Sequence, residues 1–595
     1  MSALPSAESP VTNPFGPLVG QPLDDRGVDI EEINGEAFDA CRRLVTDVAA
    51  GGYSSALTVF GDTGTGKTHL LGRVRRWLEG QPQTLFVFVR METSAGGIWR
   101  HLRRRLAISL LAARPGDIRP LDRILGRARG ELEALEHRDL SIVLEHLLEG
   151  RHARDCAAWL RGEGLPEEAL SALRLALPGP NDDPEVISQH LVMALCHLIR
   201  PNAVIWCMDQ IEAIRSSADD RDGPQAFGRA VCCLVEETRN SGVISCQQSS
   251  FMNMMAEILD AAAQSKVFAR RAVIRPLDWG QAVRLIGARL DTVPDLAIQR
   301  RGQSPCWPLA ESKIRDVFVD NAAPARKVIS RCKDLFDLWS NRQTDSESQD
   351  EALQRELNAR FSTKEPSETE AILRNGLPLL ARAVGLACKV PGGRSPFNFL
   401  LDNGRVAIGI CNEVDGRSIT SRLKKISDAW NPAENPALLL MRDARTVIPR
   451  GANVGRQKLA DIERKGGRLV TISQEALEAL AALRRLYSDA ESGDLAWRGD
   501  RVDPGTVEKW IGGHLPVALD PLVSGLGSAP APVDRTAGLA ELLAERKLVT
   551  LEDAARSLGV TTGEIEECAR RDPRQFGLLG GSVPALFQPV AAGAR

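Results

Sequence analysis

The chain has 595 residues, a length typical of roughly three or four domains, and 43% of them are apolar, enough to build a core in each. A net charge of −3 excludes a protein that is polycationic as a whole. No run of 18 apolar residues and no signal-like start occur, and the twelve cysteines form no C-x-x-C pair. We therefore expect a cytoplasmic protein without a membrane segment, a zinc module or a disulfide framework.

The first recognisable elements lead into a glycine-rich loop. Residues 1–26 lack periodicity and predict a flexible N-terminus, and residues 28–50 place apolar side chains at the spacing of an amphipathic helix. Residues 57–71 then read LTVFGDTGTGKTHLL. An apolar strand at 57–60 runs directly into a G-x-x-x-x-G-K-T loop, which is followed by a helix from His69.

This loop has the composition of a phosphate-binding P-loop. Its glycines allow a tight turn in which backbone N–H groups and the start of the next helix face phosphate oxygens. Lys67 would reach the β- and γ-phosphates of ATP, and the Thr68 hydroxyl would ligate Mg²⁺. The alternative is a glycine loop without a ligand. The predicted nucleotide-binding residues here are Gly61, Asp62, Thr63, Gly64, Thr65, Gly66, Lys67, Thr68 and His69.

An arginine-rich region follows the next predicted strand, at 84–89. Residues 100–129 hold nine arginines against two aspartates. Two interpretations stay open, because these arginines could line a DNA channel or form a solvated helix face. Residues 131–200 are helical in pattern, with an interruption at 178–184, and we interpret them as an insertion within the ATPase core.

A strand at 203–209 ends in a carboxylate, as a second phosphate-side strand requires. Asp209 would hold the Mg²⁺ shell together with Thr68, and Glu212 is the candidate for polarising the attacking water. Gln210 stands where a catalytic Glu often follows the Asp, so slow hydrolysis is expected. The alternative is an ordinary buried strand with a terminal Asp.

A further strand at 242–248 also ends in polar residues. Gln247 or Gln248 would either sense the γ-phosphate or cap a loop. The segments that follow are predicted to form a helix, a strand and a helix at 251–265, 272–275 and 281–290.

This order of features resembles the AAA+ ATPases, and among them the origin-recognition-complex-like and STAND ATPases. The resemblance covers about residues 28–340 and includes an arginine pair before the last strand and a Pro-x-Arg in a helical lid. It implies a homo-oligomer in which Arg271, or Arg270, is an arginine finger that reaches the γ-phosphate of a neighbouring subunit. It also implies that Arg326 is a lid sensor on the nucleotide. The alternative is that these arginines are surface charges.

A polar linker at 341–370 separates this part from a second, small α/β domain. Its predicted strands lie at 397–401, 406–411, 437–441 and 469–472, and its helices at 418–429, 454–465 and 474–487.

Asp402 and Glu413 flank a strand of this domain in a pattern that resembles the restriction-endonuclease-like nucleases. Their metal site uses an Asp and a Glu-x-Lys on adjoining strands, and Asp415 stands where that Lys should be, so a degenerate site is implied. Residues 442–468 carry eight Lys and Arg against three acids. They could contact a DNA backbone or form a solvated basic face.

The last block predicts a winged helix-turn-helix. Its helices are expected at 537–546 and 550–558, its recognition helix from Thr562, and its wing at 577–587. The origin-recognition-like initiators end in such a domain, which favours DNA reading. Acidic residues in the recognition helix favour protein docking instead, since Glu564, Glu566 and Glu567 oppose Arg570 and Arg571.

The predicted fold class is α/β. The expected parts are a flexible N-terminus (1–26), an AAA+-like P-loop core with a helical insertion (27–275), a helical lid (276–340), a linker (341–370), a small α/β domain (371–490), a helical segment (491–526) and a winged helix-turn-helix (537–595).

The predicted function is that of an ATP- and Mg²⁺-dependent switch or assembly ATPase that acts on DNA, in replication, transposition or phage defence. Its DNA contacts would come from the regions Arg100–Arg129 and Arg442–Arg468, and its protein contacts from the winged helix. One alternative is a STAND-like scaffold that oligomerises with ATP and recruits a protein effector. Another is an ATP-gated nuclease.

Overall fold

The structure divides into two compact units, and each is described by itself. The first contains Met1–Leu379, Glu413–Ser418 and Leu477–His514, and the second contains Leu380–Asn412, Ile419–Ala476 and Leu515–Arg595. Residues 477–514 thus group with the P-loop part, whereas the sequence pattern assigned all of them to the small α/β domain (371–490) and the helical segment after it (491–526). The computed structural model describes residues 13–16, 28–51, 53–91, 95–112, 118–128, 130, 137–177, 179, 182–215, 220–340, 348–361, 369–391, 395–432, 434–449, 452–491, 493, 495–497, 500–527, 539, 542–543, 546–558, 562, 565–566, 569, 576–579 and 585–587.

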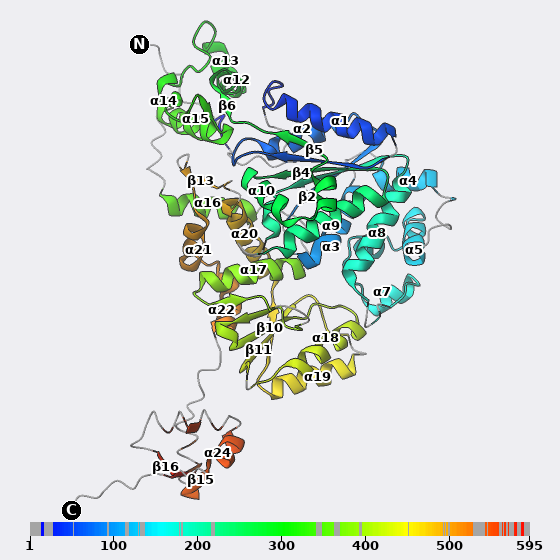
Figure 1. Ribbon diagram of the computed structural model, residues 1–595, viewed down its shortest axis with the longest axis vertical. Helices are drawn as coiled ribbons and strands as arrows, with labels where there is room; N and C mark the ends of the chain where they lie inside the picture. Colours follow the sequence, from blue (N-terminus) through cyan, green and yellow to red (C-terminus); the bar gives the residue numbers. More distant parts are fainter. Residues whose placement is uncertain are drawn as a thin grey trace, which may run out of the picture. The chain divides into compact units, whose positions relative to one another are not determined.

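A parallel five-stranded sheet forms the centre of the first unit (Figure 1). Every pairing in it is parallel, so the predicted α/β class with a parallel sheet is confirmed. Because the strands share one direction, the carboxyl ends of β3, β4 and β1 meet at one edge, where ligands of such sheets bind. The strand order is β2 (Thr84–Arg90), β3 (Ala203–Asp209), β4 (Ser241–Gln247), β1 (Ser55–Phe60) and β5 (Arg270–Val273).

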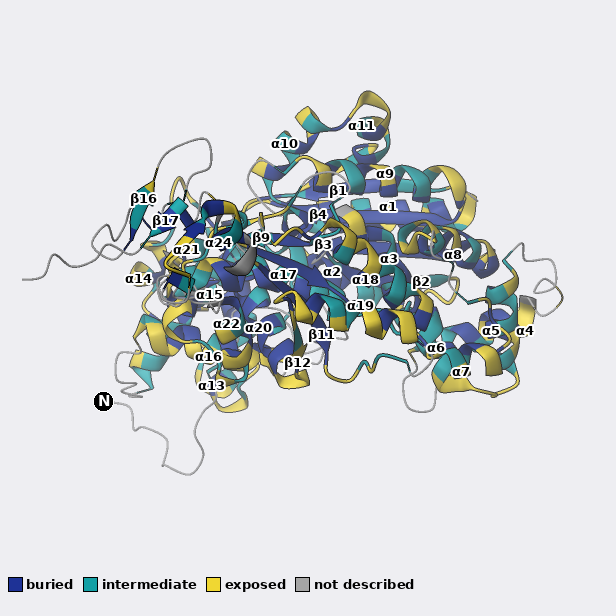
Figure 2. Cartoon of the chain, turned by 90° about the horizontal axis from the view of Figure 1, so that it is seen from below, coloured by how far each residue is buried: buried dark blue, intermediate teal, exposed yellow. Residues whose placement is uncertain are grey.

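Helices cover both faces of this sheet, as Figures 1 and 2 show. The reason is visible in β3, which is buried along its whole length. Its alternate side chains enter two separate cores, Ile205 and Cys207 on one face and Val204, Trp206 and Met208 on the other. Helices α1 (Gly35–Gly51) and α2 (Lys67–Leu78) pack in the first core, and α3 (Ile98–Leu111), α8 (Pro184–Ile199) and α9 (Asp222–Glu237) in the second.

The insertion between β2 and β3 is helical, as predicted. The helix predicted at 251–265 is in fact two helices, because Asp260 caps a new helix by accepting the N–H of Ala263 at 2.8 Å. The remaining elements up to β5 are η1 (Ala95–Gly97), α4 (Pro120–Ala128), α5 (Arg138–Leu148), α6 (Ala153–Leu160), α7 (Glu167–Ala172), η3 (Ile211–Ile214), α10 (Ser249–Ile258) and α11 (Ala261–Val267).

The lid has a core of its own, which includes Leu290, Val328 and Phe336. Phe15 completes this core and is fully buried, and Asn13 donates to the Asp337 carboxylate at 2.8 Å. Part of the predicted flexible N-terminus is therefore fixed, because an aromatic side chain there fills the lid interior. The lid elements are β6 (Leu277–Asp278), α12 (Trp279–Leu290), α13 (Pro294–Gln299), α14 (Glu311–Arg315), β7 (Ala322–Ala323) and α15 (Ala325–Trp339).

Further helices follow the lid. Residues 341–347 and 362–368 of the predicted linker lie outside the described residues. The elements are α16 (Gln349–Phe361), α17 (Thr369–Ala383), α20 (Gln474–Glu491), β13 (Ala496–Trp497), β14 (Asp500–Arg501) and α21 (Pro504–Gly513).

The second unit contains a mixed five-stranded sheet in the order β12-β11-β10-β9-β8. The pairings of β10 with β11 and of β11 with β12 are parallel, and those of β8 with β9 and of β9 with β10 are antiparallel. Strands and helices alternate here as the sequence predicts. The elements are β8 (Cys388–Lys389), β9 (Phe399–Leu401), η4 (Asp402–Gly404), β10 (Val406–Ile410), α18 (Gly416–Ala429), β11 (Ala437–Asp443), α19 (Asn453–Arg464), β12 (Arg468–Ile472), η5 (Val517–Leu519) and α22 (Asp520–Gly527).

The last block contains α24 (Leu551–Leu558) and an antiparallel sheet of β15 (Leu548–Thr550), β17 (Ala585–Phe587) and β16 (Gly577–Leu579). Much of the predicted recognition helix, including Glu564, Glu567, Arg570 and Arg571, lies outside the described residues, so the winged helix-turn-helix stays a prediction. Across the described part of the chain, none of the helices combines the length and apolarity needed to cross a bilayer.

Candidate nucleotide-binding site

The P-loop joins β1 to α2 and has a backbone shape that requires glycine. Gly64 has φ +75° and Gly66 has φ +110°, both in the left-handed region. A Cβ atom on Gly61 would lie 2.5 Å from the carbonyl oxygen of Ile274, closer than two such atoms can approach. The Thr65 hydroxyl closes the turn by donating to the carbonyl of Asp62 at 2.7 Å. The loop is therefore the tight cradle that the motif predicts.

The two predicted Mg²⁺ ligands meet beside this loop. Thr68, in the first turn of α2, donates its hydroxyl to Oδ2 of Asp209 at 2.7 Å. Asp209 ends β3 and is only 4% exposed, and its Oδ1 accepts the N–H of Gln210 at 3.0 Å. Lys67 lies over the loop, because its Nζ donates to the carbonyls of Gly61 at 2.8 Å and Asp62 at 3.0 Å. These three side chains are of the types that bind Mg²⁺ and ATP phosphates in P-loop proteins, and that role stays a prediction here.

Gln247 ends β4, the strand between β1 and β3. Its carbonyl accepts the N–H of Gly61 at 3.4 Å, and its side chain is fully buried. Among the described residues, neither its carboxamide nitrogen nor its oxygen has a hydrogen-bond partner. A buried amide without a partner costs about 1–3 kcal/mol, which makes Gln247 a candidate for a ligand contact at this edge of the sheet. Gln248, the other predicted sensor, instead donates to the carbonyl of Glu491 at 3.5 Å.

The lid reaches the P-loop through Arg326. The backbone N–H of Arg326 donates to the carbonyl of Gly64 at 3.1 Å, and its Nη1 donates to the carbonyl of Gly493 at 2.9 Å. Gly493 itself has φ +70°, and a Cβ atom there would lie 2.5 Å from Cγ2 of Thr63. The chain after α20 thus also contacts the loop. Sequence reasoning missed this contact, because no local pattern marks Gly493.

The remaining predicted site residues are placed as follows. Glu212 is half-buried in η3, directly after β3, and His69 is exposed on α2. Arg270 forms an ion pair with Asp47 of α1 at 2.7 Å, whereas Arg271 is exposed with its guanidinium 5.1 Å from the ring centre of Phe268. Of the two arginines, Arg271 is the better candidate for a finger, and that role stays a prediction.

Arg103 and Arg104 of α3 are buried in contacts within the protein, so neither a DNA surface nor a solvated face describes these two residues. Arg103 is 8% exposed, donates to the carbonyl of Leu160 at 3.1 Å, and stacks on Trp159. Arg104 is equally buried and pairs with Glu163 at 3.3 Å. A guanidinium can be buried in this way because its stem is apolar and its donors find carbonyl or carboxylate acceptors.

The other arginines of this region differ in their surroundings. Arg100 pairs with Glu185 at 3.1 Å and Glu370 at 3.0 Å, and Arg105 donates to a backbone carbonyl at 2.7 Å. Arg123 and Arg127 are exposed on α4. Arg114 and Arg129 lie outside the described residues.

The second unit divides its basic residues in a similar way. Arg442 is 2% exposed and donates to the carbonyl of Thr446 at 2.7 Å, so it is a structural residue. Among the described residues of 442–468, the exposed basic residues are Arg445, Arg456, Arg464, Lys465 and Arg468.

The nuclease hypothesis depends on Asp402 and Glu413. Asp402 has φ +48° and pairs with Arg405 at 3.7 Å, and Glu413 belongs to the first unit. In the part of the chain that the structure describes, no three His, Cys, Asp or Glu side chains are grouped to hold a metal ion.

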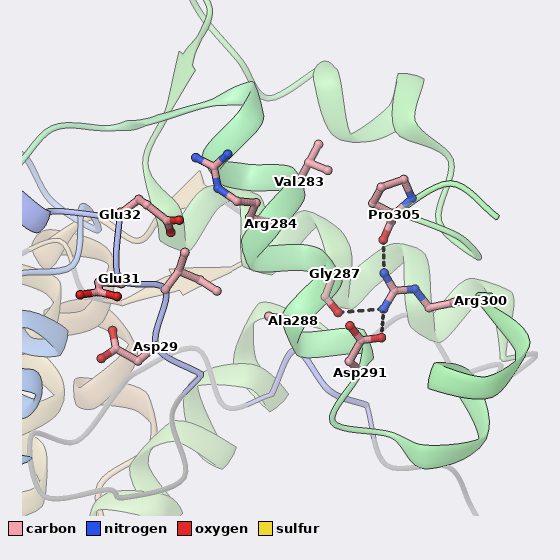
Figure 3. A pocket seen from close by; sticks show the side chains of 11 residues that line it. Asp29, Glu31, Glu32, Val283, Arg284, Gly287, Ala288, Asp291, Arg300 and Pro305 are labelled. Carbon is pink, nitrogen blue, oxygen red and sulfur yellow. Dashed lines mark hydrogen bonds and ion pairs between the residues drawn. The ribbon is translucent and has the colours of Figure 1, made fainter. Parts of the chain in front are cut away.

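A pocket of about 520 Å³ lies between the segment 29–32 and α12 (Figure 3). Glu32 points into it from the segment and Arg284 from the helix, whereas the side chains of Asp29 and Glu31 point away from α12. Arg300 borders it and is held by the Gly287 carbonyl at 2.8 Å and the Asp291 carboxylate at 2.5 Å. No P-loop residue lines it, so it is distinct from the candidate nucleotide-binding site.

Comparisons with solved structures found Cdc6p and ORC proteins. Cdc6p from Pyrobaculum aerophilum is 10% identical with a TM-score of 0.32, covering 75% of this chain and 89% of that one. The Orc1 protein of Aeropyrum pernix in complex with DNA is 14% identical with a TM-score of 0.30, covering 62% and 77%. Drosophila ORC bound to DNA is 10% identical with a TM-score of 0.30, covering 66% and 77%.

TM-scores of this size do not establish a common fold, so the site itself carries the functional conclusion. Neither the protein-family models nor the curated proteins gave a match.

Proposed function

We propose that the chain is a Mg²⁺-dependent ATPase of the AAA+ type that works as a switch on DNA. The contact between Thr68 and Asp209 at 2.7 Å carries this proposal. The two side chains come from residues 141 positions apart and are the pair that a P-loop ATPase uses to hold Mg²⁺. The glycine cradle and the unsatisfied carboxamide of Gln247 fit the same ligand.

Each residue of the site has a separate task in this proposal. The Mg²⁺–ATP complex, when bound, supplies the phosphoryl group and neutralises part of its charge. Lys67 would exchange the carbonyls of Gly61 and Asp62 for phosphate oxygens. Gln247 would donate its carboxamide N–H to a phosphate oxygen, and Glu212 would orient the attacking water. Arg326, bonded to the P-loop backbone, would transmit the nucleotide state to the lid.

Replacing Gln247 by methionine is expected to stabilise the protein and weaken its activity. The free energy of unfolding should rise by about 1–3 kcal/mol, because the buried unsatisfied amide disappears. The kcat for ATP should fall about a hundredfold if the amide contacts the reacting phosphate. Denaturant unfolding and steady-state phosphate release measure the two effects.

Gln264 provides the matched control, since its amide already donates to the carbonyls of Ala256 at 2.7 Å and Leu259 at 2.9 Å. Gln264→Met should therefore destabilise the protein and leave kcat unchanged. Unchanged hydrolysis in Gln247→Met would exclude Gln247 as the sensor.

The DNA part of the proposal rests on the exposed basic residues of the second unit. Duplex DNA at low salt should stimulate ATP hydrolysis by the wild type. Changing Arg464, Lys465 and Arg468 to glutamine should remove that stimulation. The slope of the logarithm of the DNA-binding constant against the logarithm of the salt concentration should become shallower by about 0.9 for each phosphate that the variant no longer neutralises. Arg123→Gln with Arg127→Gln on α4 is the matched control. If only this control loses the stimulation, the DNA site lies on the first unit instead.

A second candidate function is the ATP-driven signalling scaffold. The buried arginines of α3 favour it, because they remove much of one predicted DNA-binding region. A wild-type ATPase that ignores DNA at every salt concentration would support this alternative over the DNA switch.

A further inference from the structure

A buried carboxylate, Asp489 of α20, lies near the end of the strand that precedes the arginine-rich helix. Asp489 is 3% exposed and accepts hydrogen bonds from Arg360 of α16, whose Nε lies 2.9 Å away, and from Arg90 at the end of β2. Burial alone would raise the pKa of this carboxyl group. The charges and hydrogen bonds of the two arginines outweigh burial and hold the pKa below its usual value, so Asp489 is ionised.

This ion cluster continues into the candidate Mg²⁺ site through Gln210. The side-chain oxygen of Gln210 accepts a hydrogen bond from Nε of Arg90 at 2.9 Å. The side-chain NH₂ group of Gln210 donates a hydrogen bond to the carboxylate of Asp489. Gln210 is 7% exposed and has φ +54°, a left-handed backbone that costs a non-glycine residue about 1–2 kcal/mol. In that conformation its N–H donates to Oδ1 of Asp209, whose Oδ2 accepts the hydroxyl of Thr68. Hydrogen bonds to the side chain and to the backbone N–H of Gln210, joined by the covalent bonds of that residue, therefore connect Asp489 to the two candidate Mg²⁺ ligands.

We propose that Asp489 is a positioning residue for Mg²⁺. With Arg90, it holds the side chain of Gln210 and so fixes the backbone N–H that orients the carboxylate of Asp209 toward Thr68. This inference rests on the proposed ATPase function, because it assigns Asp489 a role in the same site. Partners of this kind, one step behind the metal ligands, commonly change metal affinity or activity by about 10- to 100-fold.

A second route from α20 to the site must be separated from this one. Arg326 of the lid donates to the carbonyl of Gly493, and Gly493 contacts Thr63 of the P-loop. A disturbed α20 could therefore act through Gly493 rather than through Gln210. Gln210→Ala distinguishes the two routes, because it leaves the Asp489–Arg360 pair intact and cuts only the proposed connection.

The test is a titration of Mg²⁺ against a fixed concentration of N-methylanthraniloyl-ATP, followed by fluorescence. In Asp489→Asn the Mg²⁺ concentration at half-saturation should rise about tenfold, and nucleotide affinity in excess EDTA should stay unchanged. Gln210→Ala should give the same rise with little loss of Tm. The double variant should show no further rise, since both changes cut one chain of hydrogen bonds.

Glu370 supplies a control for the loss of a carboxylate that two arginines hold. It also lies between two arginines, Arg100 at 3.0 Å and Arg374 at 2.6 Å, and both of these partners lie outside the nucleotide site. Glu370→Gln should lower the Tm and leave the Mg²⁺ titration as in the wild type.

The outcomes separate the inference from the function on which it rests. A wild type that binds the nucleotide without any Mg²⁺ dependence overturns both. A wild type with a clear Mg²⁺ dependence and a folded Asp489→Asn or Gln210→Ala that follows the wild-type curve overturns the positioning role alone. Additive shifts in the double variant would also overturn it, in favour of the route through Gly493.

Discussion

Replacing Lys67 by alanine is expected to reduce the kcat for ATP hydrolysis about a hundredfold to a thousandfold, the decrease that follows removal of one aligned donor from a reacting centre. The Lys67 ammonium group already lies over the loop, within 2.8 Å and 3.0 Å of two carbonyl oxygens that face the same space. Alanine has no positive charge with which to stabilise the negative charge on the γ-phosphate during transfer. Phosphate release at saturating ATP measures the effect.

Lys266→Ala is the control for this change. Lys266 forms an exposed ion pair with Glu236 at 3.3 Å, and such pairs contribute only about 0–1 kcal/mol, so hydrolysis should be unchanged. Hydrolysis by Lys67→Ala at more than a tenth of the wild-type rate would mean that the P-loop is not the ATPase site.

Replacing Gly61 by alanine is expected to destabilise the protein by about 1–3 kcal/mol, in the range of overpacked cores, and to abolish nucleotide binding. The added Cβ would lie 2.5 Å from the carbonyl oxygen of Ile274 and 3.2 Å from the hydroxyl of Thr65. Ile274 cannot withdraw freely, because its N–H donates to the carbonyl of Phe60 at 2.9 Å and it directly follows β5, which pairs with β1. The loop must therefore change its path. Denaturant unfolding and N-methylanthraniloyl-ATP binding measure both effects.

Gly126→Ala separates this clash from the general effect of replacing glycine. Gly126 is exposed on α4 and has nothing within 4 Å of the position of a Cβ atom. Alanine there should stabilise the helix by about 0.5–1 kcal/mol and leave nucleotide binding unchanged. Gly61→Ala with wild-type affinity would show that the loop tolerates a side chain at this position.

The parts of the site that the sequence predicted are those with strong local signals. The P-loop occupies consecutive residues between an apolar strand and a helix, so its strand–loop–helix geometry followed from the motif. Asp209 was predictable because an apolar run ended in a carboxylate. Gln247 was one of two candidates, and only its burial without a partner distinguishes it from Gln248.

The features that the sequence did not predict depend on contacts between distant residues. The positive charge of α3 was visible, but its acceptors, the carbonyl of Leu160 and the carboxylate of Glu163, lie in another helix and the turn after it. Asp489 is an ordinary acidic residue in a helical pattern until α20 is placed beside β2. Composition gives the charge of a segment, and only the fold determines whether a partner or water neutralises that charge.

The position of Phe15 has a consequence for how the protein can be divided. The ring of Phe15 lies 6.3 Å from that of Phe336 in the middle of the lid core, although more than 250 residues separate Phe15 from the start of the lid. Removing a buried aromatic side chain typically lowers the free energy of unfolding by about 3–5 kcal/mol, which is a large share of the total for a small domain. Residues 276–340 are therefore not an autonomous folding unit, and the lid is assembled from two ends of the P-loop part of the chain.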